Sequence, residues 1–536
     1  MAKGKPLNEK IADSLRQLVG VTNEGQRRVF RSDELSRLHR ERLIEAKYIE
    51  EIMKGWYYAS RLGFDAAAWH SAFWEFAREY LDDRFGVGNW VISPEGSVAI
   101  HAERWEVPAQ VVVHAKANAN GNLPLPYGTS IYVLGKHFDF QPRHINGTPV
   151  YPAVAAICEI QPNAWRALKK DIVSVLGSIR GTTDILRYLV GARAPASAGR
   201  LAGALRKLDK ARDADQIVQG MKAAGYEVRE TDPFDGDVPE FRLPKRPVAA
   251  IDTRIRLLWS TLRNGVLDGF TLPTGRLPPK DTYLAEIEDR YISDAYNSLS
   301  IEGYQVTPDL VERVSAGDWD PDHRQADFET RNALAARGYW QAFQIVKADV
   351  GRILDGEDAA EIVCERHADW RAELFRPLVN AGFIKPVDLI GYRQHPVYIR
   401  GSAHVPVSET SIQPAMEAML DCLAGETDPR VGAVLGPFVF TYIHPFGDGN
   451  GRTGRFIMNA MLASGGYPWT IIPVARKPEY MAALEEASSH ENAGPLASFI
   501  AELVAAPPPP RPDETAWPKF RTVVSSSPGP AEPGRA

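Results

Sequence analysis

Residues 444–455 read HPFGDGNGRTGR, and the interpretation of the whole C-terminal half depends on this stretch. The apolar run 431–443 predicts a helix that enters it, and residues 452–464 predict an amphipathic helix that leaves it. Between the two helices, the glycines of 447–451 predict a tight loop whose backbone N–H groups turn inward. The positive end of the following helix dipole lies at the same place. The segment therefore predicts an anion-binding cradle at a helix N-terminus.

The charged side chains of this segment indicate a polyphosphate ligand. Arg452 and Arg455 are three residues apart and share one face of the first helical turn. Cations are disfavoured there by roughly 0.3–1 kcal/mol each, so the pair makes sense beside a bound polyanion. Asp448 supplies the single carboxylate that Mg²⁺ takes from protein when phosphates provide other ligands. His444 is suited to accept a proton from an attacking hydroxyl.

Two other interpretations of the segment account for it less well. A glycine-rich connector with a hydrogen-bonded histidine would be unremarkable if it stood alone, but it does not explain all these groups within twelve residues. A P-loop is excluded because GxxxxGK[ST] does not occur in the chain.

The complete motif resembles the signature of the Fic (Fic/Doc) family, whose best-known members transfer AMP from ATP to protein hydroxyls. The resemblance covers residues 250–505 approximately. It implies His444 as general base, Asp448 as the Mg²⁺ ligand, and ATP as co-substrate. It also implies that Gly449, Asn450 and Gly451 form a cradle for the α-phosphate. Arg452 and Arg455 are implied to bind the outer phosphates.

Residues 392–408, YRQHPVYIRGSAHVPVS, predict a β-hairpin turning at Gly401 and Ser402. An exposed hairpin edge can hold an extended target segment by strand addition. The hairpin resembles the Fic flap, which docks the target protein, although an ordinary surface hairpin is the alternative. The resemblance assigns the docking role to Val397, Tyr398, Ile399, Arg400, Gly401 and Ser402.

A second segment, SLSIEG at 298–303, is predicted to end a helix that spans 282–303. Gly303 is its expected C-cap, and Ser298 and Glu302 share one face. A carboxylate at this end of a helix is disfavoured unless a cation relieves it. The segment resembles the family's inhibitory motif [ST]xxxE[GN], which implies that Glu302 pairs with Arg455 and obstructs the ATP γ-phosphate. An ordinary exposed glutamate is the alternative.

The N-terminal half is predicted to be α+β. Residues 1–62 predict a winged-helix module of two helices and an aromatic hairpin, with Ser32 capping the second helix; a basic helical hairpin is the alternative. Residues 63–245 predict an α+β domain, and with GWYYASR at 55–61 the region loosely resembles the antitoxin-like module of abortive-infection systems. The elements expected in it are helices at 66–85, 198–208 and 213–224, and strands at 98–101, 110–114, 129–134 and 226–230.

Composition sets the outer limits. The 536 residues are 44% hydrophobic, and 62 Lys and Arg against 68 Asp and Glu give a formal net charge of −6. That balance gives no electrostatic footprint for bulk nucleic-acid or membrane binding. The cysteines are scattered singly at 158, 364 and 422, which excludes a disulfide framework and favours a reducing, cytoplasmic location. The proline-rich tail 506–536 is expected to be disordered.

Taken together, the sequence predicts a multidomain protein with a mainly α Fic core at 246–505, a β-hairpin flap and an α+β N-terminal region. The predicted function is an autoinhibited Mg²⁺-dependent protein adenylyltransferase that modifies a Ser, Thr or Tyr hydroxyl of a target protein. One alternative is an enzyme that removes AMP at the same site. Another is a DNA-binding regulator whose Fic core senses nucleotide, and a toxin–antitoxin-like fusion is a related hypothesis. The sequence leaves the oligomeric state open.

Overall fold

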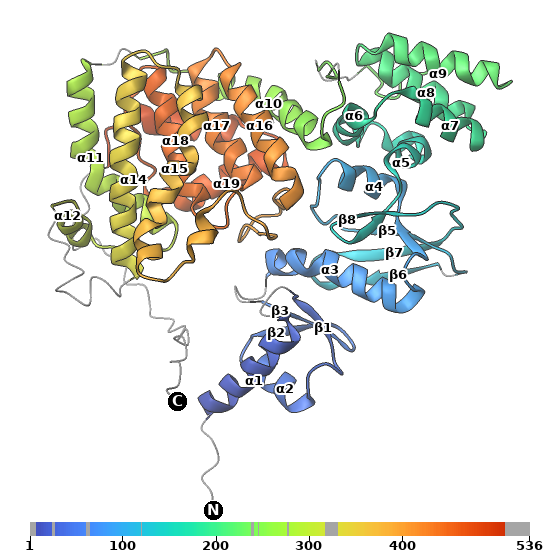
Figure 1. Cartoon of the computed structure of the whole chain (residues 1–536), viewed down its shortest axis with the longest axis horizontal. Helices are drawn as coiled ribbons and strands as arrows, with labels where there is room; N and C mark the ends of the chain where they lie inside the picture. Colours follow the sequence, from blue (N-terminus) through green and yellow to red (C-terminus); the bar gives the residue numbers. More distant parts are fainter. Residues whose placement is uncertain are drawn as a thin grey trace, which may run out of the picture.

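The computed structural model describes residues 7–23, 27–60, 65–118, 120–236, 241–244, 246–275, 278–316 and 331–509. Three parts follow one another along the chain (Figure 1): a small N-terminal unit, an α+β domain, and a larger helical body that carries the C-terminal half. Of the tail predicted to be disordered, 510–536 lies outside the described residues. None of the described helices is both long and apolar enough to cross a membrane.

The N-terminal unit places two helices against a three-stranded antiparallel sheet with the strand order β1-β3-β2. Leu18, Phe30 and Leu43 are buried at the centre of its small core. The elements are α1 (Leu7–Val21), β1 (Val29–Arg31), α2 (Arg37–Glu45), β2 (Ile49–Met53) and β3 (Trp56–Ala59). The aromatic hairpin expected there is present, but β1 also intervenes between the two helices. Assignment of this unit as a winged helix, and binding of DNA by it, stay predictions.

The helix start expected at Ser32 is wrong. Residues 32–35 form a turn in which Ser32 N–H donates to Gly55 O at 2.9 Å, and α2 begins only at Arg37. The acidic residue that suggested a first helical turn, Glu34, is used elsewhere: its carboxylate accepts from the backbone N–H of Arg31 at 2.7 Å and pairs with Arg27. Side chain–backbone bonding of this kind competes with helix formation.

The α+β domain has a four-stranded sheet with the order β4-β5-β7-β6, in which β5 and β7 are parallel. The long helix α3 (Ala66–Phe85) packs against the sheet with Trp69, Phe73 and Phe76 buried. The helix and two strands were predicted to within one residue. The strands are β4 (Trp90–Ile92), β5 (Val111–Ala115), β6 (Gly121–Pro124) and β7 (Ser130–Gly135), and a two-stranded ribbon of β8 (Arg143–Ile145) and β9 (Thr148–Val150) follows.

Two predicted strands of this domain are wrong. The apolar run 98–101 belongs to helix α4 (Pro94–His101), which begins because Ser93 caps it and Pro94 stands in its first turn. Residues 226–230 are extended but pair with no described strand, since the chain here runs over α8 (Pro195–Lys207) instead of joining a sheet. A Cβ at Gly199 would lie 2.0 Å from Arg229 O, so this close approach requires glycine.

Helices complete the α+β domain and link it to the C-terminal body. They are α5 (Ala153–Glu159), α6 (Lys169–Ser178), α7 (Thr182–Gly191), α8 and α9 (Ala211–Ala223). Between the two parts, Arg254 of α10 donates to Asp171 of α6 at 2.9 Å and to the Tyr442 hydroxyl at 3.1 Å. Asp171 also pairs with Arg104 at 2.8 Å. A charged network therefore crosses this interface.

The C-terminal body is a bundle built around two central helices, α17 (Pro429–Ile443) and α18 (Asn450–Ser464), which are buried over most of their length. This agrees with the expected mainly α core. The surrounding helices are α10 (Ala250–Gly269), α11 (Lys280–Ile301), α12 (Pro308–Ala316), α14 (Arg331–Leu354), α15 (Ala359–Asn380), α16 (Ile412–Ala424), α19 (Lys477–Ser489) and α20 (Gly494–Ala505).

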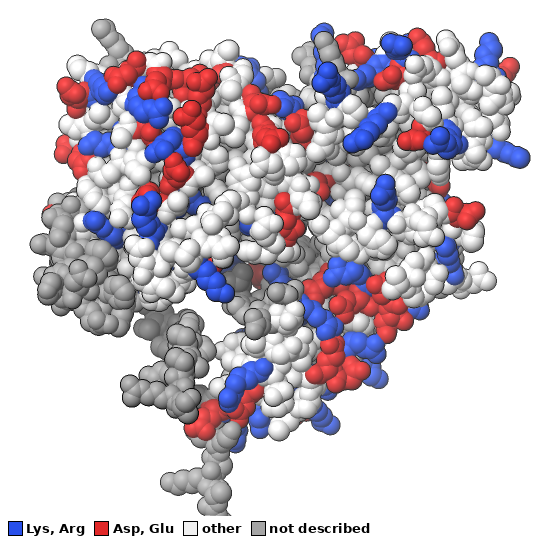
Figure 2. Space-filling view, in the orientation of Figure 1, with Lys and Arg blue, Asp and Glu red and all other residues white. Residues whose placement is uncertain are grey.

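Surface charge is mixed in sign. Figure 2 shows acidic and basic side chains intermingled on this face, including a dense cluster where the N-terminal unit meets α3. Ion pairs account for much of that cluster, with Arg27 to Glu79 at 2.8 Å and Arg31 to Asp83 at 2.5 Å. Such partly exposed pairs fix orientation more than they add stability.

The β-hairpin predicted at 392–408 is wrong. These residues contain a turn, in which Ser402 N–H donates to Ile399 O at 3.2 Å, but no strand. Their hydrogen bonds run to other elements: Arg393 N–H donates to Pro445 O at 2.9 Å, and Ala403 N–H donates to Glu485 at 2.9 Å. The apolar residues of 392–408 thus pack against other elements of the fold, and the segment forms no cross-strand pairs.

Candidate active site

The predicted base, His444, lies at the C-terminal end of α17 in a left-handed conformation with φ 55° and ψ 58°. Its Nδ1 lies 3.2 Å from Thr441 O. A carbonyl only accepts, so Nδ1 carries the proton and Nε2 keeps its lone pair. Burial is the main cause that lowers the pKa of His444 to about 4. At neutral pH the ring is therefore uncharged and able to act as a base.

The loop after His444 is fixed by Asn450. Its side-chain oxygen accepts from Phe446 N–H at 3.0 Å, and its amide nitrogen donates to Phe446 O at 2.8 Å. The oxygen and the nitrogen of the side-chain amide are therefore both occupied in holding the loop. Gly449 adopts φ 92°, and a Cβ there would lie 2.7 Å from the Phe375 ring. Only glycine fits that position.

The first turn of α18 lies where the sequence predicts the cradle. The helix begins at Asn450, so the N–H groups of its first residues have no partner within the helix. A Cβ on Gly451 would lie 2.3 Å from Glu302 Oε1. The carboxylate of Glu302 therefore lies directly against the bare backbone of this turn, which is the place where the sequence predicts a phosphate.

Glu302 caps α11, and Gly303 follows with φ 87°, as expected for a glycine C-cap. The expected ion pair is present: Arg455 Nη2 lies 2.7 Å from Glu302 Oε1. Ser298 completes the contact, since its hydroxyl accepts from Arg455 Nε at 2.8 Å. Burial would raise the pKa of Glu302, but the charges of Arg455 and Arg452 outweigh burial and the pKa lies below its ordinary value.

Arg452 is fully buried, with a side chain that is 0% exposed. Its guanidinium lies over Phe375 at 4.8 Å and over Tyr304 at 5.1 Å. Nη2 contacts Asp448 Oδ1 at 3.2 Å, while Nε and Nη1 are buried and make no hydrogen bond in the described part of the chain. Buried donors without partners are costly, and an anion in the cradle would supply acceptors for them.

Asp448 is more accessible, with a side chain that is 51% exposed. Its Oδ1 accepts from Gly449 N–H at 2.6 Å as well as from Arg452. Within the described ranges, no cluster of three or more His, Cys, Asp or Glu could hold a metal ion by itself. A lone accessible carboxylate beside an anion cradle fits Mg²⁺ that is bound jointly with substrate phosphates.

Two buried arginines that the sequence analysis missed also hold the site. Arg371 of α15 donates to Asp448 O at 3.3 Å and to Asp388 O at 3.2 Å, and burial lowers its pKa to about 10. Arg393 donates to His444 O at 2.9 Å. Nothing in the sequence distinguishes them from neighbouring arginines such as Arg366, Arg376 and Arg400.

The residues predicted to dock a target do not form a free edge. The Tyr398 ring lies 4.4 Å from the guanidinium of Arg28, in the N-terminal unit. Ser402 donates its hydroxyl proton to Glu485 at 2.5 Å. Val397 and Ile399 are half-buried, and Arg400 and Gly401 are exposed at the turn.

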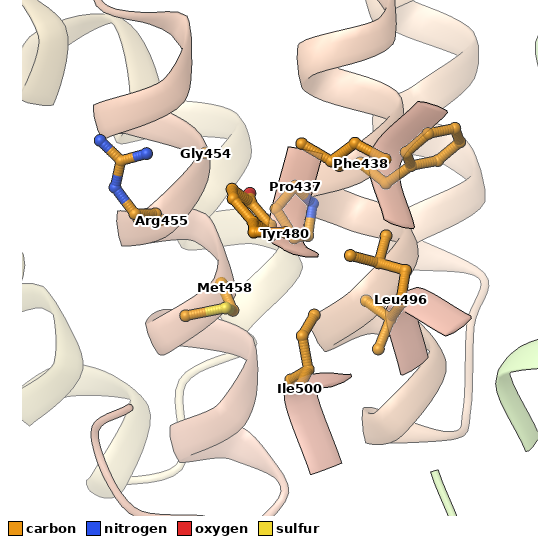
Figure 3. Close-up of a pocket in the computed structure, with 10 residues that line it drawn as sticks. Pro437, Phe438, Gly454, Arg455, Met458, Tyr480, Leu496 and Ile500 are labelled. Carbon is orange, nitrogen blue, oxygen red and sulfur yellow. The ribbon is translucent and has the colours of Figure 1, made fainter. Parts of the chain in front are cut away.

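A small cavity of about 10 Å³ lies on the other side of α18, between α17, α19 and α20. Figure 3 shows Pro437, Met458, Tyr480 and Leu496 facing it, while the Arg455 side chain points away from this apolar lining. A cavity of this size holds about one water molecule. It is packing space, since Arg455 is the one residue of the predicted site that lines it.

Residues 360–462, which contain α15 through most of α18, match the model of the Fic/DOC family. The chain is therefore similar to the Fic/DOC family over residues 360–462. This match includes the 444–455 segment as well as Arg371 and Arg393, and ends before α19.

Two curated relatives that match part of this chain carry the name protein adenylyltransferase Fic. The one from Drosophila willistoni is 34% identical over 219 residues, 40% of this chain and 40% of that one. The one from Nematostella vectensis is 27% identical over 237 residues, 43% of this chain and 50% of that one. The match thus spans half or less of the length of these relatives.

Solved structures with some likeness include a Fic domain containing signaling protein from Bacteroides thetaiotaomicron and Fic-1 (aa134 - 508) from C. elegans. The first is 17% identical, covers 47% of this chain and 92% of its own, and has a TM-score of 0.35. The second is 18% identical, covers 64% and 94%, and has a TM-score of 0.34.

Proposed function

We propose that this chain is a Mg²⁺-dependent protein adenylyltransferase that Glu302 holds in an inactive state. The observation that carries the proposal is the contact between the Glu302 carboxylate and the backbone of Gly451. A carboxylate that rests in an anion cradle and pairs with Arg455 imitates a phosphate group. The family match and the names of the relatives support AMP as the transferred group.

The chain's own residues can carry out the transfer. His444 Nε2 accepts the proton of a target Ser, Thr or Tyr hydroxyl, whose oxygen attacks the α-phosphorus of ATP. A phosphodiester bond forms between this oxygen and the α-phosphorus, the bond from the α-phosphorus to the pyrophosphate oxygen breaks, and pyrophosphate leaves. Thr441 O orients the imidazole, because it accepts the proton on Nδ1. Orientation and charge stabilisation then account for most of the rate enhancement.

The charges at the site suit a nucleotide triphosphate. Arg371, Arg393, Arg452 and Arg455 approach the loop, whereas Asp448 and Glu302 are the carboxylates bonded to these arginines or to the loop. The arginines outnumber the carboxylates, so the site carries an excess of positive charge that favours binding of a polyanion. Asp448 would hold Mg²⁺, which would neutralise charge on the transferring and leaving phosphates.

Autoinhibition follows from competition for Arg455. While Arg455 binds Glu302 and Ser298, its Nε and Nη2 donors are not available to the outer phosphates. The Glu302 carboxylate also repels a phosphate approaching Gly451. Release of Glu302 from this position is therefore the expected activating event.

Removal of AMP is a second candidate, and one observation favours it. The Glu302 side chain is 27% exposed and ionised, so water reaches the carboxylate in the same site as His444. A carboxylate there could orient water toward the phosphorus of an AMP-modified side chain. Incubation of an AMP-modified protein with wild type and Glu302→Gln would detect this reaction, which requires AMP release by wild type alone.

The proposed transfer is tested with ATP labelled at the α- or the γ-phosphate, Mg²⁺ and a cell lysate as the source of targets. Glu302→Gly should label protein from the α-position only, and Glu302→Gly with His444→Ala should not label protein. Protein label from the γ-position would instead show a kinase-like reaction. Absence of label from either position would overturn the proposal.

A further inference from the structure

His404 joins the α+β domain to the loop that carries the proposed base. It is buried, with a side chain that is 3% exposed. Its Nε2 lies 2.8 Å from Tyr442 O, at the end of α17 and two residues before His444. Its Nδ1 lies 3.1 Å from Glu106 Oε1, in the α+β domain. The His404 ring also stacks on the Tyr442 ring at 3.9 Å.

The partners of His404 determine its protonation state. The carbonyl of Tyr442 can only accept, and an ionised Glu106 can only accept. Glu106 Oε1 faces His404 Nδ1, whereas Oε2 is buried and has no hydrogen-bond partner in the described part of the chain. An imidazole that bonds to both acceptors must carry a proton on each nitrogen.

We propose that His404 is a positioning residue that Glu106 of the α+β domain holds as an imidazolium. His404 then fixes the Tyr442 carbonyl and, through it, the turn at the end of α17 that carries His444, here called the elbow. The expected effect on the rate of transfer rests on the proposed function, whereas the expected protonation state of His404 does not. Arg393 holds the next part of the elbow from the same 392–408 segment, through His444 O at 2.9 Å.

The charged groups around His404 come from several elements. Glu485 of α19 holds the neighbouring Ser402 and Ala403, and interacts with the charge on His404. Arg254 of α10 opposes it through its interaction with Glu106 and its bond to the Tyr442 hydroxyl. His444 itself is uncharged at neutral pH, which avoids repulsion between the two rings.

Glu106 and Glu103 form a matched pair for the test. Glu103 also crosses to the C-terminal body, where it accepts from Ser408 N–H at 3.2 Å and from the Ser411 hydroxyl at 2.7 Å. It makes no hydrogen bond to His404 in the described part of the chain. Glu106→Gln keeps the size of the side chain and one acceptor oxygen, and removes its charge.

The first measurement uses the full chain with ¹⁵N-labelled histidine and follows ring nitrogens by NMR as pH rises. His404 should stay doubly protonated at pH 7.5 in wild type and in Glu103→Gln, and become neutral in Glu106→Gln. A neutral His404 in wild type would overturn the inference. Because this measurement requires no turnover, it stands whether or not the chain transfers AMP.

The second measurement is kinetic and uses the Glu302→Gly background with α-labelled ATP. Adding Glu106→Gln or His404→Gln should lower kcat about tenfold or more and leave the KM for ATP within about twofold, because the elbow moves and the cradle does not. Adding Glu103→Gln should leave both constants near the parent values. Equal losses of kcat in Glu103→Gln and Glu106→Gln would show that any contact between the two parts of the chain has this effect, and would overturn the positioning role of His404. If the Glu302→Gly parent shows no transfer, the proposed function fails while the NMR result is unaffected.

Discussion

Substitution of Glu302 by glycine should strengthen binding of Mg²⁺–ATP. In wild type, the nucleotide must displace a carboxylate that pairs with Arg455 at 2.7 Å and lies against Gly451. The Arg455 side chain is only 6% exposed, so the pair is partly shielded from water. A hydrogen bond to a charged group is worth about 1.5–3 kcal/mol, which corresponds to an affinity gain of about 10- to 150-fold when the competition is removed.

The assay is isothermal titration of Mg²⁺–ATP into proteins that also carry His444→Ala, so that no turnover occurs. Glu302→Gln is the charge control and should give an intermediate affinity, because the amide oxygen can still accept from Arg455. Glu357→Gly is the positional control: Glu357 follows the end of α14 and pairs with Arg352 at 2.7 Å, away from the cradle. An affinity of Glu302→Gly equal to wild type would refute the competition.

Three further predictions concern the loop and its base. Since the pKa of His444 is about 4, this base stays deprotonated as pH falls through 6.5, and transfer by Glu302→Gly should persist to about pH 5. Loss of half of the transfer rate near pH 6.5, the ordinary pKa of histidine, would contradict this account. Asn450→Ala leaves two buried backbone groups of Phe446 without partners and should lower the free energy of unfolding by about 2–4 kcal/mol in a urea titration. A loss below about 1 kcal/mol, or a loss equal to that of the exposed control Asn492→Ala, would show that the Asn450 side chain does not hold the loop. Chelation of Mg²⁺, or Asp448→Ala, should reduce transfer by about a hundredfold or more, and undiminished transfer with chelator present would exclude the metal role of Asp448.

The candidate site was largely predictable because its chemistry is local in sequence. Seven of its predicted residues lie within 444–455, and the spacing of two helices around glycines determines how they meet. The pairing of Glu302 with Arg455 was expected from the resemblance to the family's inhibitory motif, and the helix dipole independently favours a cation beside this carboxylate. The roles of these residues in transfer remain predictions that the experiments above address.

The errors arose where tertiary contacts override a short local pattern. Residues 98–101 have the apolar character of a strand, but Ser93 and Pro94 start a helix. The segment 392–408 alternates like a strand and yet is held by side chains from three parts of the chain, among them Arg28 and Glu106. Arg371 and Arg393 could not be found from sequence, because their partners are backbone carbonyls that only the fold brings near.

The central claim is tested most directly by the initial rate at which α-labelled ATP labels protein, compared between wild type and Glu302→Gly at matched ATP and Mg²⁺. The account predicts a rate at least about tenfold higher in Glu302→Gly at subsaturating ATP, since Glu302 competes with the nucleotide for Arg455. Equal rates would contradict it, because the carboxylate against Gly451 would then have no effect on transfer.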